Sequence, residues 1–332
     1  MNFLATIWVG LIAFSIILYI ILDGFDLGIG MLALFFKNEH DRDIMISTVL
    51  PVWDGNETWL VFSGATLYGA FPLAFSVILP FLYIPIFIMV IALLFRGISF
   101  EFRLKAIKTK PFWDICLFLG SLLATFAQGL ILGTFVQGFN LTTNTDGSQF
   151  NQWLNPFGIA CGIALVFGYI LLGSNRLIAK TSGNLQESCF KISTKLQYAI
   201  LGFVIMVSIW SPFLSQEIKQ RWFNPHYLPY LAILPMLAAI FLIIHWYAIK
   251  NKYELTPFWS SVGVFLTCYF GFVISCYPFI VPRSITYIQA AAPKSSLLFM
   301  LIGACIMLPP LLYHTYVSYK IFGGKVDEKI GY

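Results

Sequence analysis

The sequence predicts an all-α polytopic membrane protein with nine transmembrane helices, its N-terminus outside the cell and its C-terminus inside. Three observations predict this class. The 332-residue chain is 59% hydrophobic and only 11% charged, with a mean hydropathy of +0.82, a composition typical of lipid-facing helices. Apolar stretches long enough to cross a bilayer recur along its whole length. The basic residues, finally, are distributed unequally between the connections.

Nine stretches of the chain fit a membrane-crossing helix of about twenty residues. We expect them to form one integral membrane domain over residues 1–332. The first stretch lacks the basic flank and the cleavage site of a signal peptide, so we expect it to be retained. The second and third meet at a short turn near Phe71 and Pro72. The predicted spans are 3–24, 51–71, 77–97, 114–136, 154–175, 198–216, 229–249, 258–281 and 296–319.

The basic residues orient these spans. If the N-terminus lies outside, all but four of the 20 Lys and Arg residues fall in inner connections or in the C-terminal tail. This bias follows the positive-inside rule and favours an odd number of spans. The net charge of +5 is therefore assigned to loop asymmetry, and nucleic acid is not expected as a partner. The four exceptions are Lys219, Arg221, Arg283 and Lys294.

The six cysteines show no CxxC pair, and most of them lie within apolar runs. Buried free thiols behave as small hydrophobic side chains. We expect neither disulfides nor a metal site from them.

Two pairs of acids interrupt the first two spans. Asp23 and Asp26 lie in ILDGFDLGIG, and Asp54 and Glu57 lie in PVWDGNETWL. The i, i+3 spacing places each pair on one helix face. With a rise of 1.5 Å per residue, the four carboxyls lie at depths of about 9 to 20 Å from the inner helix ends.

A proton or ion pathway is the favoured interpretation of these acids. The alternative is that the first span ends at Leu22 and leaves both aspartates among the lipid headgroups, but the ten residues after Asp26 are uncharged. An acid within hydrocarbon is costly unless it is paired, hydrated or protonated, and it usually marks a functional site. Gly24 and Gly28 form a small-xxx-small face that predicts close approach of another helix.

Six motifs, in order along the chain, resemble subunit II of the bacterial cytochrome bd-type quinol oxidases. They run from residue 23 to the C-terminal tail, so the resemblance covers essentially the whole chain. The chain is compact for this family, as in its cyanide-insensitive branch. The motifs are DGFDLGIG (23–30), PVWDGNETWL (51–60), FRGISFEFR (95–103), LNPFGIACG (154–162), YPFIVPRS (277–284) and LLYHTYVSYKIFG (311–323).

The resemblance implies two four-helix bundles plus one extra helix, in a multi-pass protein of the bacterial cytoplasmic (inner) membrane. It implies a haem-free subunit II that stabilises a haem-bearing subunit I in the aerobic respiratory chain. The complex would oxidise quinol and reduce O2 to water, using haem b and haem d, or b-type haem only, in the partner. This chain alone is not expected to be catalytic. The quinone used, the haem type and a third small subunit stay open, as does a structural quinone of the kind that some relatives hold.

The resemblance also assigns roles to the acids. Asp23 and Asp54 match acids of a proton route from the cytoplasm toward the active-site haem. Asp26 and Glu57 match the same motifs, but Glu57 stands where relatives carry Gln, which leaves its role less defined. Trp59 matches a tryptophan near an oxygen route, and aromatic packing explains a tryptophan there equally well.

Further polar residues have two interpretations each. Arg96, Glu101 and Arg103 either pair with subunit I or anchor the third span in anionic headgroups, and the second is favoured. Gln128 and Gln137 face either a quinone or another helix, and interhelical hydrogen bonds are favoured.

The four histidines are the candidate haem ligands, because a membrane haem usually takes an axial His. His40 and His226 fall in loops, and His245 and His314 lie toward the inner ends of their spans. We expect them to be satisfied by lipid or loop groups.

Two other functions stay open at this point. A proton-coupled secondary transporter would show broken helices in paired positions of two repeats, and no such pairing is visible. A pure assembly scaffold would use the acids only to fix helix contacts. It predicts loss of the complex when they are neutralised, whereas a proton path predicts an intact complex with low turnover.

Overall fold

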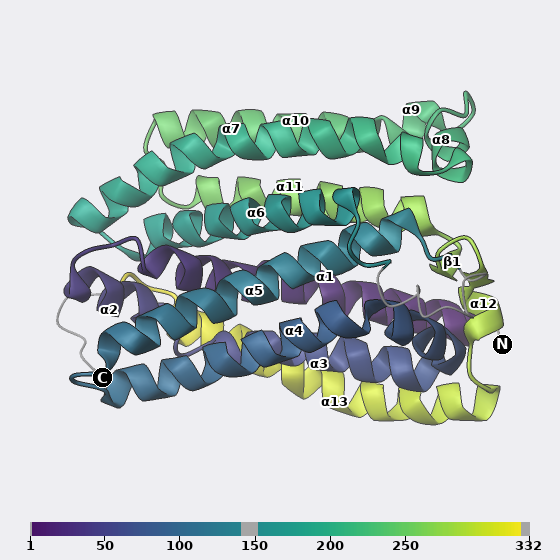
Figure 1. The fold of residues 1–332 in the computed structure, drawn as a ribbon, viewed down its shortest axis with the longest axis horizontal. Coiled ribbons are helices and arrows are strands. Elements are labelled where there is room, and N and C mark those ends of the chain that lie inside the picture. Colours follow the sequence, from purple (N-terminus) through teal and green to yellow (C-terminus); the bar gives the residue numbers. More distant parts are fainter. Residues whose placement is uncertain (1, 141–151, 327–332) are drawn as a thin grey trace.

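Figure 1 shows the computed structural model, which describes residues 2–140 and 152–326. Long helices lie side by side and make up most of the described chain. They are α1 (Asn2–Ala33), α3 (Trp53–Ala70), α4 (Pro72–Lys105), α5 (Lys110–Gln137), α6 (Pro156–Lys180), α7 (Gly183–Leu214), α10 (Ile233–Lys250), α11 (Thr256–Cys276) and α13 (Lys294–Ile321).

Short elements lie at the two ends of these helices. An antiparallel pair of strands follows α11, and short helices connect the long ones. The short elements are α2 (Glu39–Ser47), α8 (Gln216–Trp222), α9 (Leu228–Leu231), β1 (Phe279–Val281), β2 (Ile285–Thr286) and α12 (Tyr287–Ala290).

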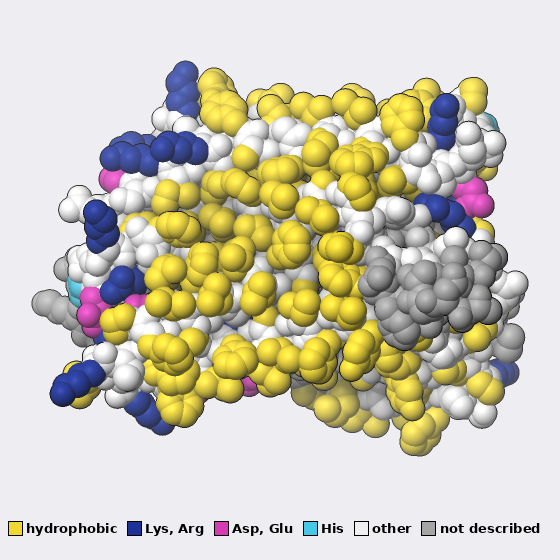
Figure 2. Space-filling model, in the orientation of Figure 1, with side chains coloured by type: hydrophobic (Ala, Val, Ile, Leu, Met, Phe, Trp, Pro, Cys, Tyr) yellow, Lys and Arg dark blue, Asp and Glu magenta, His cyan; other side chains and the backbone are white. Residues whose placement is uncertain are grey.

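The chain is an all-α, multi-pass membrane protein. Within the described ranges, eight helices are long and apolar enough to cross a bilayer, with α9 and α10 counted as one. Helix α3, at the predicted span 51–71, is not among them, because polar and acidic residues in its first two turns make it less apolar. Figure 2 shows hydrophobic side chains over the middle of one face, with Lys and Arg gathered toward its two ends.

Several helix ends differ from the predicted span boundaries, most of all in α7, which begins at Gly183 and not at residue 198. Helix α1 continues to Ala33 instead of ending at residue 24, because the apolar residues after Asp26 are buried against neighbouring helices. The alternative that the span ends at Leu22 is therefore also wrong. Helix α4 extends beyond both ends of 77–97: it begins at Pro72, and it continues to Lys105 past Arg103, which pairs with Asp114 inside the protein. Helix α11 stops at Cys276, short of residue 281, where the proline-containing hairpin begins.

The long helices pack in two groups. Helices α1, α3, α4 and α5 contact one another, as do α6, α7, α10 and α11, while α13 packs on α3 and α1. Helices α1 and α5 also contact α6 and so join the two groups. The largest buried apolar cluster lies at this junction and includes Phe25, Leu27, Leu117 and Tyr169.

Gly28 sets the closest approach between α1 and α6. A Cβ atom at this position would lie 1.8 Å from the backbone carbonyl oxygen of Tyr169. At Gly24, one turn earlier, it would lie 2.8 Å from the Tyr169 ring. The predicted small-residue face is thus the contact surface of α1 with α6.

A Gly28→Ala substitution should destabilise the protein by about 1–3 kcal/mol, because the new methyl group overlaps backbone that cannot move without separating the helices. Gly10→Ala on the same helix is the matched control, since nothing lies within 4 Å of its added Cβ. Thermal unfolding of the two purified variants measures the difference. Equal melting temperatures would contradict the close contact.

His245 lies in a buried polar network, not at the lipid interface as expected. Its side chain is 1% exposed. Its Nε2 lies 3.0 Å from Asn175 Nδ2, and its Nδ1 lies 3.0 Å from Gln197 Oε1. Ser193 donates a hydrogen bond to Asn175 Oδ1 at 2.6 Å. The network joins α6, α7 and α10, so these polar groups are satisfied within the protein.

Ion pairs join α2 to the ends of α4 and α5. Arg103 is 2% exposed and pairs with the buried Asp114 and, at 2.7 Å, with Asp43. Lys110 pairs with Asp43 at 3.0 Å and with Glu39 at 2.8 Å. Anchoring in headgroups is therefore the wrong interpretation for Arg103, because its guanidinium group is held inside the protein.

Asp43 makes the stability contributed by these ion pairs depend on pH. Burial alone would raise the pKa of its carboxyl, but hydrogen bonds from Arg103 and Lys110 lower it below its ordinary value. A lowered pKa stabilises the fold above the ordinary Asp pKa of about 3.9, and the contribution is lost as the pH falls through the lowered value.

An Asp43→Asn variant should therefore have a lower melting temperature than the wild type near neutral pH. The free energy of unfolding should fall by up to about 1 kcal/mol, because the carboxyl is partly exposed. The difference should vanish in acid, where the wild-type carboxyl is protonated too. Melting curves at both pH values test this, and a difference that persists in acid would show that Asp43 acts through something other than its charge.

Candidate functional site

Arg96 of α4 is the centre of the acid cluster. Its guanidinium donates to Asp23 Oδ1 at 2.6 Å through Nη1 and to Glu57 Oε2 at 2.8 Å through Nη2. Asp23 and Arg96 are 0% exposed, and the side chain of Glu57 is 24% exposed. We call these three residues the ion triad. Because Arg96 is fully buried, anchoring in headgroups is the wrong interpretation for it as well.

The triad ties three helices together at one level. Asp23 comes from α1, Glu57 from α3 and Arg96 from α4. A buried charge must be paired to be tolerated, and a guanidinium fork can serve two carboxylates at once. The arrangement leaves Asp23 and Glu57 each with a positively charged partner.

Asp26 lies one turn further along α1 and has different surroundings. It is 0% exposed. Its Oδ2 accepts a hydrogen bond of 2.7 Å from Asn56 Nδ2, while its Oδ1 is buried without a partner. No Lys or Arg of the described ranges forms an ion pair with it. Asp26 is thus a buried carboxyl bonded only to a neutral amide.

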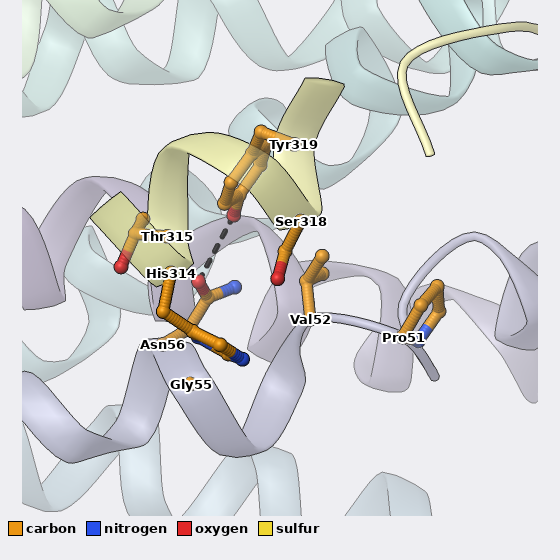
Figure 3. Close-up of a pocket in the computed structure, with 8 residues that line it drawn as sticks. All are labelled: Pro51, Val52, Gly55, Asn56, His314, Thr315, Ser318 and Tyr319. Atoms are coloured by element: carbon orange, nitrogen blue, oxygen red, sulfur yellow. Dashed lines mark hydrogen bonds between the residues drawn. The ribbon is translucent and has the colours of Figure 1, made fainter. Parts of the chain in front are cut away.

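Two residues from distant parts of the chain complete the surroundings of Asp26. Tyr319 of α13 donates to Asn56 Oδ1 at 3.0 Å, as Figure 3 shows. The guanidinium of Arg176 lies 5.1 Å from the centre of the Phe25 ring and 5.6 Å from that of Tyr319. Such stacking on aromatic faces stabilises a cation without a carboxylate partner.

The four predicted acids are not brought together as one group. Asp23 and Glu57 meet at Arg96, and Asp26 lies beside them. Asp54 is exposed on the surface of the chain, and it forms no ion pair with any described residue. The side chains of Asp54 and Glu57 therefore differ in environment although they are only three residues apart.

Trp59 is packed inside the protein. It is 0% exposed, and its ring makes edge-to-face contacts with Phe14 and Phe62 at centroid distances of 6.0 and 6.4 Å. Its indole nitrogen has no hydrogen-bond partner. These contacts are those of an aromatic packing residue, and a role beside an oxygen route stays a prediction.

Gln128 and Gln137 lie in different surroundings. Gln128 donates to the Tyr19 hydroxyl at 2.6 Å and accepts from the Tyr169 hydroxyl at 3.1 Å, so it hydrogen-bonds two neighbouring helices. Gln137 is half-buried at the last residue of α5, away from the acids. Glu101, the third charged residue of its motif, is exposed.

A small pocket lies between α3 and α13, beside Asn56 (Figure 3). Its volume is about 20 Å³. It is lined by Pro51, Val52, Gly55, Asn56, His314, Thr315, Ser318 and Tyr319.

Sequence reasoning missed Asn56, Tyr319 and Arg176 as neighbours of the acids. Asn56 stands between the two acids of its motif, and an uncharged amide gives no sign of its own that it is buried beside a carboxyl. Arg176 had a usable signal, because it follows a long apolar run and was counted simply as an inner-loop cation. Tyr319 had none, since it is separated from Asn56 by 263 residues.

Comparison with solved structures shows the fold. The bd oxidase from Geobacillus thermodenitrificans contains a chain that superposes with a TM-score of 0.78, covering 97% of this chain and 99% of that one at 17% sequence identity. This likeness concerns the arrangement of the helices alone.

Known sequences also match this chain over nearly its whole length. The cytochrome bd ubiquinol oxidase subunit 2 of Bacillus subtilis is 29% identical, with 97% of each chain covered. The cytochrome bd-I ubiquinol oxidase subunit 2 of Escherichia coli K12 is 27% identical, over 98% of this chain and 96% of its own. Residues 4–322 match the family described as cytochrome bd terminal oxidase subunit II. The chain therefore belongs to the cytochrome bd terminal oxidase subunit II family.

Proposed function

We propose that this chain is the haem-free subunit of a quinol:oxygen oxidoreductase in a bacterial cytoplasmic membrane, and that it carries part of the proton path to the site of O2 reduction. A partner subunit I holds the haems, binds quinol and reduces O2 to water. Family membership and the names of the relatives, which are subunits of ubiquinol oxidases, support this proposal.

The proposal includes nine spans with the N-terminus outside. Helix α3 ends at Ala70 and α4 begins at Pro72, so the chain reverses at Phe71 and α3 lies beside α4 and α1. At 1.5 Å per residue its length is about 27 Å, close to the roughly 30 Å of the hydrocarbon core. The distribution of Lys and Arg supports the orientation.

The environment of His245, the one buried histidine among the described residues, supports a subunit without haem. An axial ligand must present a free ring nitrogen to the iron. Both ring nitrogens of His245 contact side chains of the buried network. His40, His226 and His314 are exposed on this chain.

The single observation that carries the proton path is the environment of Asp26. Its carboxyl is fully buried beside a neutral amide, with one oxygen free of partners. A lone carboxylate so placed is costly, whereas a carboxyl that gains and loses a proton can remain there. Arg96 meanwhile keeps Asp23 and Glu57 paired. We assign proton uptake and release to Asp26, and the charged framework around it to the triad.

Asp54 and Glu57 are the acids of this site that are open to a partner. Asp54 is exposed and Glu57 is partly exposed on α3. A partner subunit covering this face would place both carboxyls at its interface. This is the direction in which the path would continue toward the haems.

Purification of the tagged chain, alone and after co-expression with its partner, tests the proposal. A visible difference spectrum with haem quantification should detect haem only in the co-purified complex, together with quinol-dependent O2 uptake. Stoichiometric haem on the isolated chain would contradict the haem-free assignment. A colourless chain that binds no partner would contradict the oxidase assignment.

A further inference from the structure

The pocket between α3 and α13 has the size and the chemistry of a water site. Its volume of about 20 Å³ is enough for one water molecule but not for an organic ligand. A buried water needs two to four polar partners. The imidazole of His314, the hydroxyl of Ser318 and the amide of Asn56 line the pocket.

Two of these groups have hydrogen-bonding capacity left. The Ser318 hydroxyl makes no hydrogen bond with another described residue, and Figure 3 shows it directed toward the middle of the lining residues. The Asn56 oxygen accepts from Tyr319, and a carbonyl oxygen has a second lone pair. A water in the pocket would satisfy both.

The side chain of Asn56 links this pocket to Asp26. The amide lines the pocket and at the same time donates to Asp26 Oδ2 at 2.7 Å. The other nearby acids do not share this access, because Asp23 and Glu57 are bound to Arg96. The pocket is therefore a direct approach to the carboxyl that has no cationic partner.

We propose that this pocket is the proton inlet of Asp26, with Asn56 as its gate; the inference rests on the proton-carrying role proposed for Asp26. When the Asn56 amide rotates away, the pocket water takes its place at Oδ2. An excess proton on that water moves to the carboxylate, so one O–H bond breaks on hydronium and one forms on Asp26. Neutral water remains and no electron is transferred. Tyr319 holds the gate closed through its bond to Asn56.

Gly55→Ala is a variant that fills the pocket. The added Cβ would lie 3.9 Å from His314 Cε1, an ordinary van der Waals contact, so the methyl occupies the space of the water without a clash. Gly64→Ala is the matched control on the same helix, because nothing lies within 4 Å of its added Cβ.

The first measurement detects the water itself. Radiolytic footprinting of the intact complex, read by mass spectrometry, modifies side chains next to bound water even where they are buried. Tyr319 should be modified in the wild type and in Gly64→Ala, and severalfold less in Gly55→Ala. An unmodified Tyr319 in the wild type, or equal modification in both variants, would overturn the water site.

The second measurement tests the inlet by O2 uptake per haem with quinol as donor. Gly55→Ala should be severalfold slower than Gly64→Ala at equal haem content. If Gly55→Ala assembles poorly, Ser318→Ala replaces it. Removing the Ser318 hydroxyl deprives the water of a hydrogen-bond partner without adding volume. The O2 uptake of Ser318→Ala should also be severalfold slower than that of Gly64→Ala.

The outcomes separate the two proposals. Slow turnover of Asp26→Asn with normal turnover of the pocket variants would overturn the inlet alone. Normal turnover of Asp26→Asn would overturn the proposed role of Asp26. Slow turnover of all of them, with Gly64→Ala unaffected, supports both.

Discussion

An Asp26→Asn substitution is expected to lower quinol-driven O2 uptake about 100-fold, the lower end of what a positioned proton-transfer group contributes. The amide has the shape of the carboxyl, and its oxygen can still accept the hydrogen bond from Asn56. It cannot take up and release a proton. The complex should therefore assemble with its full haem content, and uptake per haem is the quantity to measure.

Glu101→Gln is the matched control for this variant. Glu101 is exposed, so its neutralisation should leave both haem content and O2 uptake at wild-type values. Loss of assembled complex in Asp26→Asn would favour a scaffold role of the acids. Full activity with full assembly would remove Asp26 from the proton path.

An Arg96→Leu substitution is expected to have the largest effect on stability. It leaves Asp23 and Glu57 without a cation, and removing one partner of a buried ion pair costs about 3–5 kcal/mol. Most of the complex should fail to assemble. The amount of haem recovered with the tagged chain, and the melting temperature of any complex obtained, measure this loss.

Arg96→Leu combined with Asp23→Leu and Glu57→Leu tests the cause. Apolar residues can replace a buried ion network without loss of stability, so the triple variant should recover assembly that Arg96→Leu loses. Assembly of Arg96→Leu at wild-type yield would contradict the structural role of the triad.

The fold class and most spans could be predicted from the length and position of apolar runs, because a bilayer requires them. The continuation of α1 past residue 24 had a local signal in the ten uncharged residues after Asp26, but the predicted span did not include them, and residues 25–33 are buried by tertiary packing with α5 and α6. The two prolines of YPFIVPRS did mark the end of α11, because proline cannot continue a helix.

The acids of the site could be found because a charge among apolar residues is conspicuous. Their partners could not be assigned in the same way. Arg96 lies near the end of its predicted span and was interpreted as a headgroup anchor, although the longer α4 places it inside the bundle beside Asp23. Tyr319 and Asn56 are brought together only by the packing of α13 on α3.

The most direct test of the account is proton uptake during a single turnover. The reduced complex is mixed rapidly with O2 in lightly buffered solution, and a pH-sensitive dye follows the protons taken up from the cytoplasmic side. Asp26→Asn should take up protons about 100-fold more slowly than the wild type, while Glu101→Gln should match the wild type. Equal uptake rates in Asp26→Asn and the wild type would contradict the account.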